Sequence, residues 1–430
     1  MIKILQVRNI DSFVESRRQR TSEKDRKTVQ KILNDVRKNG DSAVKKYERK
    51  FNGRKTSQLR VSAKEIKEAK SKISWEDDEA IEGAEYPLAT AEEEMLAWYL
   101  SIPEYTSGLP YMTKSFVPIP SVGCYVPGGQ ARYPSSAIMS VVPARMAGVK
   151  RIVVVSPPGR DGKIDPLTIA AAKKFGATEI YKVGGAQAIG ALAYGTKSIP
   201  KVDKIVGPGG KFVSIAKSLV SDQTAIDMIA GPTELGIIAD ASSDPELVAL
   251  DLISQAEHSK DTMCFVITQS KTMAKQIQKS IEKLIPGVER SSIIKESISK
   301  NGFIAVCKNE KEMVELANKI APEHMELMVK NAKTLSKKIT GAGLVLIGKN
   351  TPSAASDYLL GTNHILPTNG FGRTRGGLSV LDFLKLQTVI ESDKSTLRKI
   401  SKSLKTLTDA EDLPNHYNAI KRRLVKEGLE

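Results

Sequence analysis

Aromatic residues and cysteines are scarce in this chain of 430 residues, which contains 5% aromatic residues and only three cysteines. The shortage of aromatic side chains argues against a protein that stacks the bases of single-stranded nucleic acid. Cys124, Cys264 and Cys307 are odd in number, far apart and set in apolar runs. They are therefore expected to be buried thiols in a reducing compartment, which excludes a disulfide framework and a zinc knuckle.

Long hydrophobic runs are also missing. No window approaches about 18 apolar residues, and residues 1–5 lack the long apolar region of a signal peptide. We therefore expect a cytoplasmic protein without a membrane segment. The net charge is +16, but the basic residues are interleaved with 49 acidic ones and form no separate arm. Such a surface is typical of a soluble protein that attracts anionic ligands, so we expect no nucleic-acid partner.

Histidine is rare as well, since the chain has only four. Each histidine lies near a carboxylate in the sequence, the pairs being Glu257 and His258, Glu323 and His324, Asp357 and His364, and Glu411 and His416. Histidine and carboxylate are the commonest components of acid/base and metal sites near neutral pH. Any one of these residues could belong to the surface or cap a helix, but four such pairs together indicate a functional site.

From residue 116 onwards, short apolar runs end in glycine turns and lead into helical segments. One series of such units lies between residues 122 and 220, and a second lies between residues 235 and 347. Continuous apolar strands that alternate with helices predict parallel sheets covered by helices on both faces. We therefore predict an α/β fold with two Rossmann-like parallel-sheet domains, a helical N-terminal arm and a helical C-terminal tail.

The same pattern predicts the domain boundaries. Residues 1–24 form the arm, residues 25–123 and 235–380 form a discontinuous first domain with the candidate catalytic and metal residues, residues 124–234 form a second domain, and residues 381–430 form the tail. The sheet signals stop after about residue 380, and the basic tail carries Glu411 and His416.

Gln255 and His258 are three residues apart on a predicted helix, so they share one face. With Asp357 and one more histidine they could supply nitrogen and oxygen ligands, a set that suits zinc without cysteine. Glutamine is an uncommon ligand, so the spacing alone also permits a purely structural role.

Glu323 and His324 are an adjacent acid and base that follow Pro322. Neighbours in a straight strand point to opposite faces, so both can enter one cleft only at a turn, which the proline favours. On spacing alone the pair is a candidate for acid/base catalysis, with a structural role as the alternative.

Three glycine turns follow predicted strands and open helices, at residues 127–129, 184–185 and 207–210. Such turns expose backbone N–H groups to an anion such as a pyrophosphate. None of them matches G-x-G-x-x-G, so by pattern alone each is equally consistent with a plain tight turn.

Eight motifs in this sequence occur together. They are Tyr125-Val126-Pro127-Gly128-Gly129, Val183-Gly184-Gly185-Ala186-Gln187-Ala188, Val202-Asp203-Lys204-Ile205-Val206-Gly207-Pro208-Gly209, Ala225-Ile226-Asp227-Met228, Ala230-Gly231-Pro232-Thr233-Glu234, Ser254-Gln255-Ala256-Glu257-His258, Ala321-Pro322-Glu323-His324 and Gly361-Thr362-Asn363-His364-Ile365-Leu366-Pro367-Thr368. As a set they are highly specific, and the chain after the N-terminal arm resembles the histidinol dehydrogenase family.

This resemblance implies an NAD-dependent enzyme that oxidises L-histidinol to L-histidine through the aldehyde with two NAD molecules, in the last steps of histidine biosynthesis. It also implies one Zn²⁺ per subunit, which binds substrate, and a homodimer in which the tail docks on the partner and completes the partner's site. By position in the motifs, the resemblance implies catalysis for Glu323 and His324, and zinc binding for Gln255, His258, Asp357 and His416. It implies substrate contact for His324, for the four zinc-binding residues, and for Thr233, His364 and Glu411. It implies NAD contact for Tyr125, Gln187 and Gly210.

Two positions depart from the family pattern. The family usually has serine where this chain has Thr233, which keeps a hydroxyl and adds a methyl group. The family usually has asparagine where this chain has Gly210, so one side-chain contact to NAD is expected to be lost.

Two alternatives stay open. A basic nucleic-acid-binding protein would bind RNA or DNA at moderate salt in preference to histidinol, and a zinc-dependent dehydrogenase for another amino alcohol would prefer a different substrate with NAD.

Overall fold

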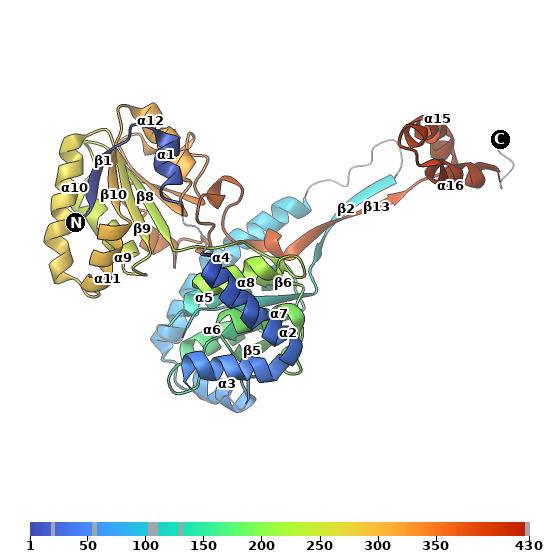
Figure 1. Cartoon of the computed structure of the whole chain (residues 1–430), viewed down its shortest axis with the longest axis horizontal. Coiled ribbons are helices and arrows are strands. Elements are labelled where there is room, and N and C mark those ends of the chain that lie inside the picture. The colour runs from blue at the N-terminus through green and yellow to red at the C-terminus, as the bar shows by residue number, and fades with distance from the viewer. Residues whose placement is uncertain (19–21, 54–57, 102–110, 129–131, 426–430) are drawn as a thin grey trace. The chain divides into compact units, whose positions relative to one another are not determined.

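The computed structural model of the chain describes all residues except 19–21, 54–57, 102–110, 129–131 and 426–430. The chain forms two compact units. The first consists of Met1–Glu94 and Ile119–Phe383, and the second consists of Met95–Pro118 and Leu384–Glu430. The first unit contains two parallel sheets (Figure 1), so the predicted α/β class with two parallel sheets is confirmed.

A five-stranded sheet has the strand order β5-β4-β3-β6-β7, and every neighbouring pair is parallel. Its strands are β3 (Ser121–Tyr125), β4 (Arg151–Ser156), β5 (Glu179–Lys182), β6 (Lys204–Val206) and β7 (Ala225–Ile226). The intervening helices are α5 (Pro134–Met146), α6 (Pro166–Phe175), α7 (Gly185–Tyr194) and α8 (Lys211–Val220). The chain order reverses between β3 and β6, and ligands of such sheets bind beyond the carboxyl ends of the strands at this point.

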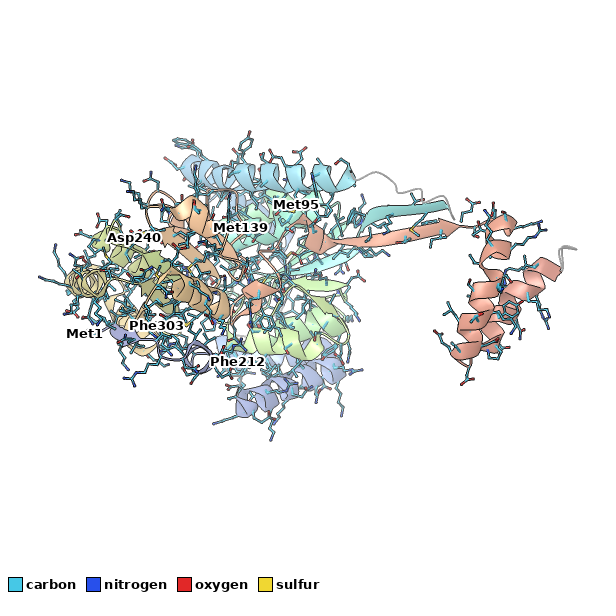
Figure 2. The ribbon with its side chains drawn as sticks, turned by 90° about the horizontal axis from the view of Figure 1, so that it is seen from above. Met1, Met95, Met139, Phe212, Asp240 and Phe303 are labelled. Carbon is cyan, nitrogen blue, oxygen red and sulfur yellow. The ribbon has the colours of Figure 1, made fainter. Side chains whose placement is uncertain are left out.

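A six-stranded parallel sheet has the order β1-β10-β9-β8-β11-β12. Its strands are β1 (Lys3–Gln6), β8 (Glu234–Ala239), β9 (Met263–Thr268), β10 (Phe303–Val306), β11 (His324–Met328) and β12 (Leu344–Ile347). One face packs against α9 (Pro245–Ala256), α10 (Lys271–Leu284) and α11 (Ser291–Lys300), and the other packs against α1 (Ile10–Glu15), α12 (Glu310–Ile320) and α13 (Ala332–Ser336). On the face covered by α1, α12 and α13, Phe303, which is labelled in Figure 2, stacks on Phe265 with 5.0 Å between the ring centroids.

The N-terminal segment differs from the predicted arm. β1 extends the six-stranded sheet at its edge, where Lys3–Gln6 pairs in parallel with Phe303–Val306. These four residues are too few to show an alternating or apolar pattern, and they are only partly buried. The pairing with β10 therefore determines that they form a strand. Residues 19–21 of the predicted arm lie outside the described part of the chain.

The helices that follow also differ from the predicted domain assignment. α2 (Glu23–Asn52) buries its apolar face in the same core as α7, α8 and the five-stranded sheet, and α3 (Ala63–Lys70) packs against α6. These residues were expected to join the six-stranded sheet. An apolar helix face shows that a helix is packed, but it does not identify the sheet that receives it.

The second unit contains an antiparallel pair of strands and two helices. β2 (Tyr111–Pro118) pairs with β13 (Leu384–Glu391), and α15 (Lys394–Ala410) packs against α16 (Pro414–Val425). α4 (Trp75–Leu100) begins in the first unit and ends in the second. The sequence predicted a helical tail, but the tail also contains the strand β13. β13 is largely exposed and so lacks the buried apolar run by which strands are recognised.

Cys124, Cys264 and Cys307 are buried and free, so the prediction of core thiols is confirmed. No helix within the described ranges has the length and apolar character needed to span a membrane.

Candidate active site

A cavity of about 280 Å³ in the first unit contains most of the predicted site residues. Pro127 and Pro208, which follow β3 and β6, line one side. Thr233, which precedes β8, and His324, which begins β11, line another. The cavity thus combines the carboxyl end of the five-stranded sheet with the amino end of two strands of the six-stranded sheet.

Glu323 lies just before β11 and accepts two hydrogen bonds. The amide of Glu234 donates to Oε2 at 3.0 Å, and the hydroxyl of Thr233 donates to the same oxygen. Ala321 has the left-handed φ of 52° at the end of α12, so the chain turns sharply before the strand, as the proline predicted. Burial raises the pKa of Glu323, although the hydrogen bonds from Thr233 and Glu234 act in the opposite direction.

His324 is 1% exposed and contacts two carboxylates. Its Nε2 lies 3.1 Å from Oδ1 of Asp357, and its Nδ1 lies 3.9 Å from Oε2 of Glu323. Burial lowers the pKa of the imidazole, but the hydrogen bond to Asp357 and the charge of Glu323 outweigh it and raise the pKa to about 9. Among the described residues, Nδ1 has no hydrogen-bond partner, so it is the ring nitrogen left for a ligand.

Asp357 follows the short helix α14 (Ser353–Ser356) and is 8% exposed. Burial tends to raise its pKa, but the hydrogen bond with His324 outweighs this effect and lowers it. The carboxylate is therefore ionised at neutral pH and can serve as a metal ligand.

Gln255, His258 and Asp357 line the same cavity. The sequence predicted that His258 lies on the same helix as Gln255. Helix α9 ends at Ala256, however, so His258 lies one residue beyond the C-cap. Nε2 of Gln255 donates to Oγ1 of Thr233 at 2.9 Å, which turns the amide oxygen, the atom that binds metals, away from that bond.

An amide oxygen, an imidazole and a carboxylate are ligands that fit Zn²⁺. No three His, Cys, Asp or Glu side chains of the described residues lie close enough to hold a metal by themselves. The donor set in the cavity therefore fits zinc in chemistry and needs a further ligand to complete four-coordination.

The cavity is also lined by Ser136, to which the sequence analysis assigned no role. Oγ of Ser136, on α5, lies 3.3 Å from Nε2 of His364, whose Nδ1 donates to the carbonyl of Asp357 at 2.8 Å. Ser136 and His364 are 228 residues apart, so no local pattern could link them. Glu234 does not line the cavity, but its amide donates to Glu323, and burial raises the pKa of its carboxyl to about 8.

The predicted NAD contacts divide into two groups. Gly210 lines the cavity, and a Cβ atom at this position would meet no atom within 4 Å. Tyr125 and Gln187 do not line it and are 5% and 2% exposed. Nε2 of Gln187 donates to Oε1 of Glu48 at 2.7 Å, and the Tyr125 hydroxyl accepts from the Gly185 amide at 3.1 Å. Gly129 of the first glycine turn lies outside the described residues.

The turn at residues 207–210 requires glycine at its start. Gly207 has a φ of +110°, and a Cβ atom there would lie 2.2 Å from the carbonyl oxygen of Tyr125. A buried ion pair between Lys217 and Asp227 holds this turn, because Lys217 donates to the Gly207 carbonyl at 2.9 Å and Asp227 accepts from its amide at 2.8 Å. The turn is thus rigid, with its backbone close to the end of β3, and fits a dinucleotide that approaches the switch point.

Glu411 and His416 belong to the second unit. Glu411 is the C-cap of α15, His416 lies in the first turn of α16, and both are exposed. The cavity in the first unit is lined without them.

Comparison with known proteins gives a consistent result. The family model for histidinol dehydrogenase matches residues 15–424. The chain is 43% identical to the histidinol dehydrogenase of Methanocaldococcus jannaschii and 42% identical to that of Oceanobacillus iheyensis, in each case over 92% of both proteins. The crystal structure of histidinol dehydrogenase from Elizabethkingia anophelis is similar with a TM-score of 0.91, at 32% identity and over 99% of both chains.

Proposed function

The chain belongs to the histidinol dehydrogenase family, an NAD-dependent oxidoreductase family, and from that premise we propose that it converts L-histidinol to L-histidine with one Zn²⁺ per subunit and two NAD molecules per turnover. Oxidation of a primary alcohol to a carboxylate removes four electrons and adds one oxygen from water. Two hydride acceptors and an activated water are therefore needed.

One observation carries the proposal. The candidate metal ligands and the candidate catalytic pair are connected by hydrogen bonds around one cavity, from Gln255 through Thr233 to Glu323, and from His324 to Asp357. A change in one group therefore shifts the geometry of the other. Such coupling supports a site in which substrate anchoring and proton transfer occur on the same small molecule.

When bound, zinc supplies a positive charge that anchors the imidazole and amine of histidinol, and NAD supplies the acceptor for hydride. In the first oxidation, the neutral form of His324, whose fraction grows as the pH rises toward the raised pKa of about 9, accepts the hydroxyl proton at Nδ1 while the alcohol carbon loses hydride. Asp357 holds the ring through Nε2, at 3.1 Å, so Nδ1 faces one direction throughout.

In the second oxidation, Glu323 removes a proton from a water molecule that attacks the aldehyde carbon. Its raised pKa favours uptake of that proton. His324, which has passed its first proton to solvent before this step, accepts the hydroxyl proton of the resulting hydrate as the second hydride leaves. His324 thus serves as a base in both half-reactions, and Glu323 serves only in the second, where the aldehyde is hydrated.

We propose further that Glu411 and His416 complete the site from the partner subunit in a homodimer, with His416 of the partner subunit as the fourth zinc ligand and Glu411 of the partner subunit as a substrate contact. Two observations support this. Gln255, His258 and Asp357 are three candidate ligands in the cavity, one fewer than four-coordinate zinc takes, and the second unit exposes large apolar side chains at Leu386, Val389 and Ile390 on β13. Large apolar side chains that are exposed in one chain can be covered by docking on another protein surface.

The test is NADH formation by purified, zinc-loaded protein with L-histidinol. The expected result is close to two NADH per histidinol consumed, with little aldehyde released. One NADH together with free aldehyde would refute the four-electron reaction. A panel of other amino alcohols distinguishes the rival dehydrogenase, and binding to RNA or DNA at moderate salt tests the nucleic-acid alternative.

A further inference from the structure

A second group of buried polar residues lies next to the site and has no part in the reaction described above. Its members are Asp251 on α9, Glu326 on β11 and Ser353 at the start of α14. The backbone amide of Ser353 donates to Oε1 of Glu326 at 2.6 Å, and the carboxyls of Glu326 and Asp251 are hydrogen-bonding neighbours. Glu326 is 1% exposed and Ser353 is 0% exposed.

Each of these residues shares an element with one residue of the proposed site. Asp251 is one helical turn before Gln255 on α9, so the two share a face. Glu326 is two residues after His324 on β11, so their side chains point to the same side of the sheet. Ser353 is four residues before Asp357, which caps the helix that Ser353 begins. The two contacts therefore connect the three elements that carry Gln255, His324 and Asp357.

Two buried carboxylates that face each other have no donor between them. Among the described residues, Glu326 Oε2 and the Ser353 hydroxyl both lack a hydrogen-bond partner, although the Ser353 side chain is near enough to Glu326 to lower the pKa of that carboxyl. One proton on the pair supplies the missing donor, and burial favours it, since burial raises the pKa of both Asp251 and Glu326.

We infer that Asp251, Glu326 and the amide of Ser353 form a positioning layer, in which one proton shared by the two carboxyls sets the spacing of α9, β11 and α14 and so holds Gln255, His324 and Asp357 in place. These are positioning residues, since they act through others. The inference rests on the zinc and catalytic roles proposed above.

Packing alone does not account for the pair. Replacement of a buried ionic or polar pair by apolar side chains of similar volume is often neutral or stabilising, so Asp251 and Glu326 add little stability that leucine or methionine could not provide. Hydrogen bonds have direction, however, and fix the distance between elements more narrowly than apolar contacts do. In metal sites, partners one layer behind the ligands are typically worth about 10- to 100-fold in metal affinity.

The test compares Glu326→Met, which removes both contacts at similar volume, with Glu326→Gln, which keeps them. Glutamine can accept from the Ser353 amide through its oxygen and donate to Asp251 through its nitrogen without any shared proton. Zinc affinity is measured in the absence of substrate, by competition with a chromophoric chelator. Glu326→Met is expected to lose about 10- to 100-fold in affinity, and Glu326→Gln is expected to stay within about threefold of the wild type, since its hydrogen bonds are retained.

Glu92 provides a matched control. It is a buried carboxyl, 4% exposed, that accepts from the backbone amide of Val380 at 2.6 Å, and burial raises its pKa to about 7. Glu92→Met should lower the unfolding temperature without changing zinc affinity. If Glu326→Met does not fold, Asp251→Ala, with Asp251→Asn as its rescue, tests the layer without disturbing the bond to Ser353.

The shared proton gives a second readout that a purely structural role would not produce. A raised folded-state pKa stabilises the fold at low pH, and that stability is lost as the pH rises through the folded value, about 8 for Glu326. His324 and Cys264 also sense the charge of Glu326, and both are retained in Glu326→Gln. The metal-free wild type should therefore lose thermal stability relative to metal-free Glu326→Gln as the pH rises from the ordinary pKa of a glutamate, about 4.5, to the folded value of about 8, and the difference should stay constant above that pH.

The outcomes distinguish the two proposals. If the wild type binds zinc and Glu326→Met binds it as tightly as Glu92→Met does, the positioning layer is refuted while the proposed function stands. If Glu326→Gln and the wild type lose stability in parallel with pH, the shared proton is refuted. If the wild type binds no zinc, the proposed function fails, and the positioning layer fails with it.

Discussion

Thr233 is the residue at which the metal ligands and the catalytic pair meet, so its replacement tests the site most directly. Its hydroxyl accepts from Gln255 at 2.9 Å and donates to Oε2 of Glu323. Thr233→Val keeps the shape of the side chain and removes both hydrogen bonds. Thr233→Ser keeps the hydroxyl and is the matched control.

The expected loss follows from the hydrogen bond to Glu323. A hydrogen bond to an ionised group contributes about 1.5–3 kcal/mol, which corresponds to about 10- to 150-fold in rate if the bond acts in the transition state. The Glu234 amide remains bonded to the same carboxylate at 3.0 Å, so the lower half of that range is expected. Because Glu323 is the proposed base for the aldehyde step, kcat/KM should fall more for L-histidinaldehyde than for L-histidinol.

The activity deficit of Thr233→Val should depend on pH through the pKa of Glu323. The hydrogen bond from Thr233 lowers the pKa of Glu323, which burial raises, so its removal in Thr233→Val raises that pKa further. A larger fraction of Glu323 is then protonated and inactive as a base, and the deficit of Thr233→Val should narrow as the pH increases.

The assay follows NADH formation from the alcohol and from the aldehyde separately, with the unfolding temperature of each variant as a check on folding. Thr233→Ser should stay within about threefold of the wild type, because its hydroxyl retains both hydrogen bonds. If Thr233→Val and Thr233→Ser have equal activity on the aldehyde, the hydroxyl does not connect the two halves of the site, and the mechanism above is wrong.

Four further outcomes are expected. Glu323→Gln should slow oxidation of the aldehyde more than that of the alcohol, by about 10²–10⁴, the value of one general base, and equal losses in the two half-reactions would exclude separate bases. His258→Asn should not regain activity when zinc is returned after chelation, whereas its NAD binding, followed by fluorescence or calorimetry, should persist; full turnover in chelated wild type would contradict the metal assignment. Gly210→Asn should lower the KM for NAD by about 2- to 10-fold, the value of one hydrogen bond, since a side chain there enters open space, and an unchanged KM would show that position 210 does not contact NAD. Mixed His324→Asn and His416→Asn chains, each inactive alone, should recover about a quarter of wild-type activity after subunit exchange, because half of the dimers carry one intact site; no recovery after confirmed exchange would mean that each chain builds its own site.

Several features of this protein followed from its sequence because they depend on local patterns. β4, with the sequence Arg151-Ile152-Val153-Val154-Val155-Ser156, is apolar on both faces, and only a strand covered by helices on both sides needs that composition. The turn at residues 207–210 was likewise visible, since its glycines allow backbone conformations such as the φ of +110° at Gly207, which other residues rarely adopt. The family was identified from short motifs in the same local way.

Other features depended on contacts between residues that are distant in the sequence. The strand β1 is short and the strand β13 is largely exposed, so neither has a clear sequence pattern. Each is recognised by the strand with which it pairs. The position of α2 likewise depends on a distant contact. Its apolar face fits either sheet in principle, and its burial against α7 shows which one receives it.

The sequence by itself determined the class of fold, the glycine turns and the residue types available for acid/base chemistry and metal binding. Only the tertiary structure decided which of them meet. Thr233 and Glu323 are 90 residues apart, and His324 and Asp357 are 33 apart. Their hydrogen bonds exist because parallel pairing of β8 with β11 places Glu323 beside Thr233, and because α14 directs Asp357 toward the start of β11. Burial, which acts on the pKa of Glu323, His324 and Asp357, arises from the same packing, and no stretch of sequence encodes it alone.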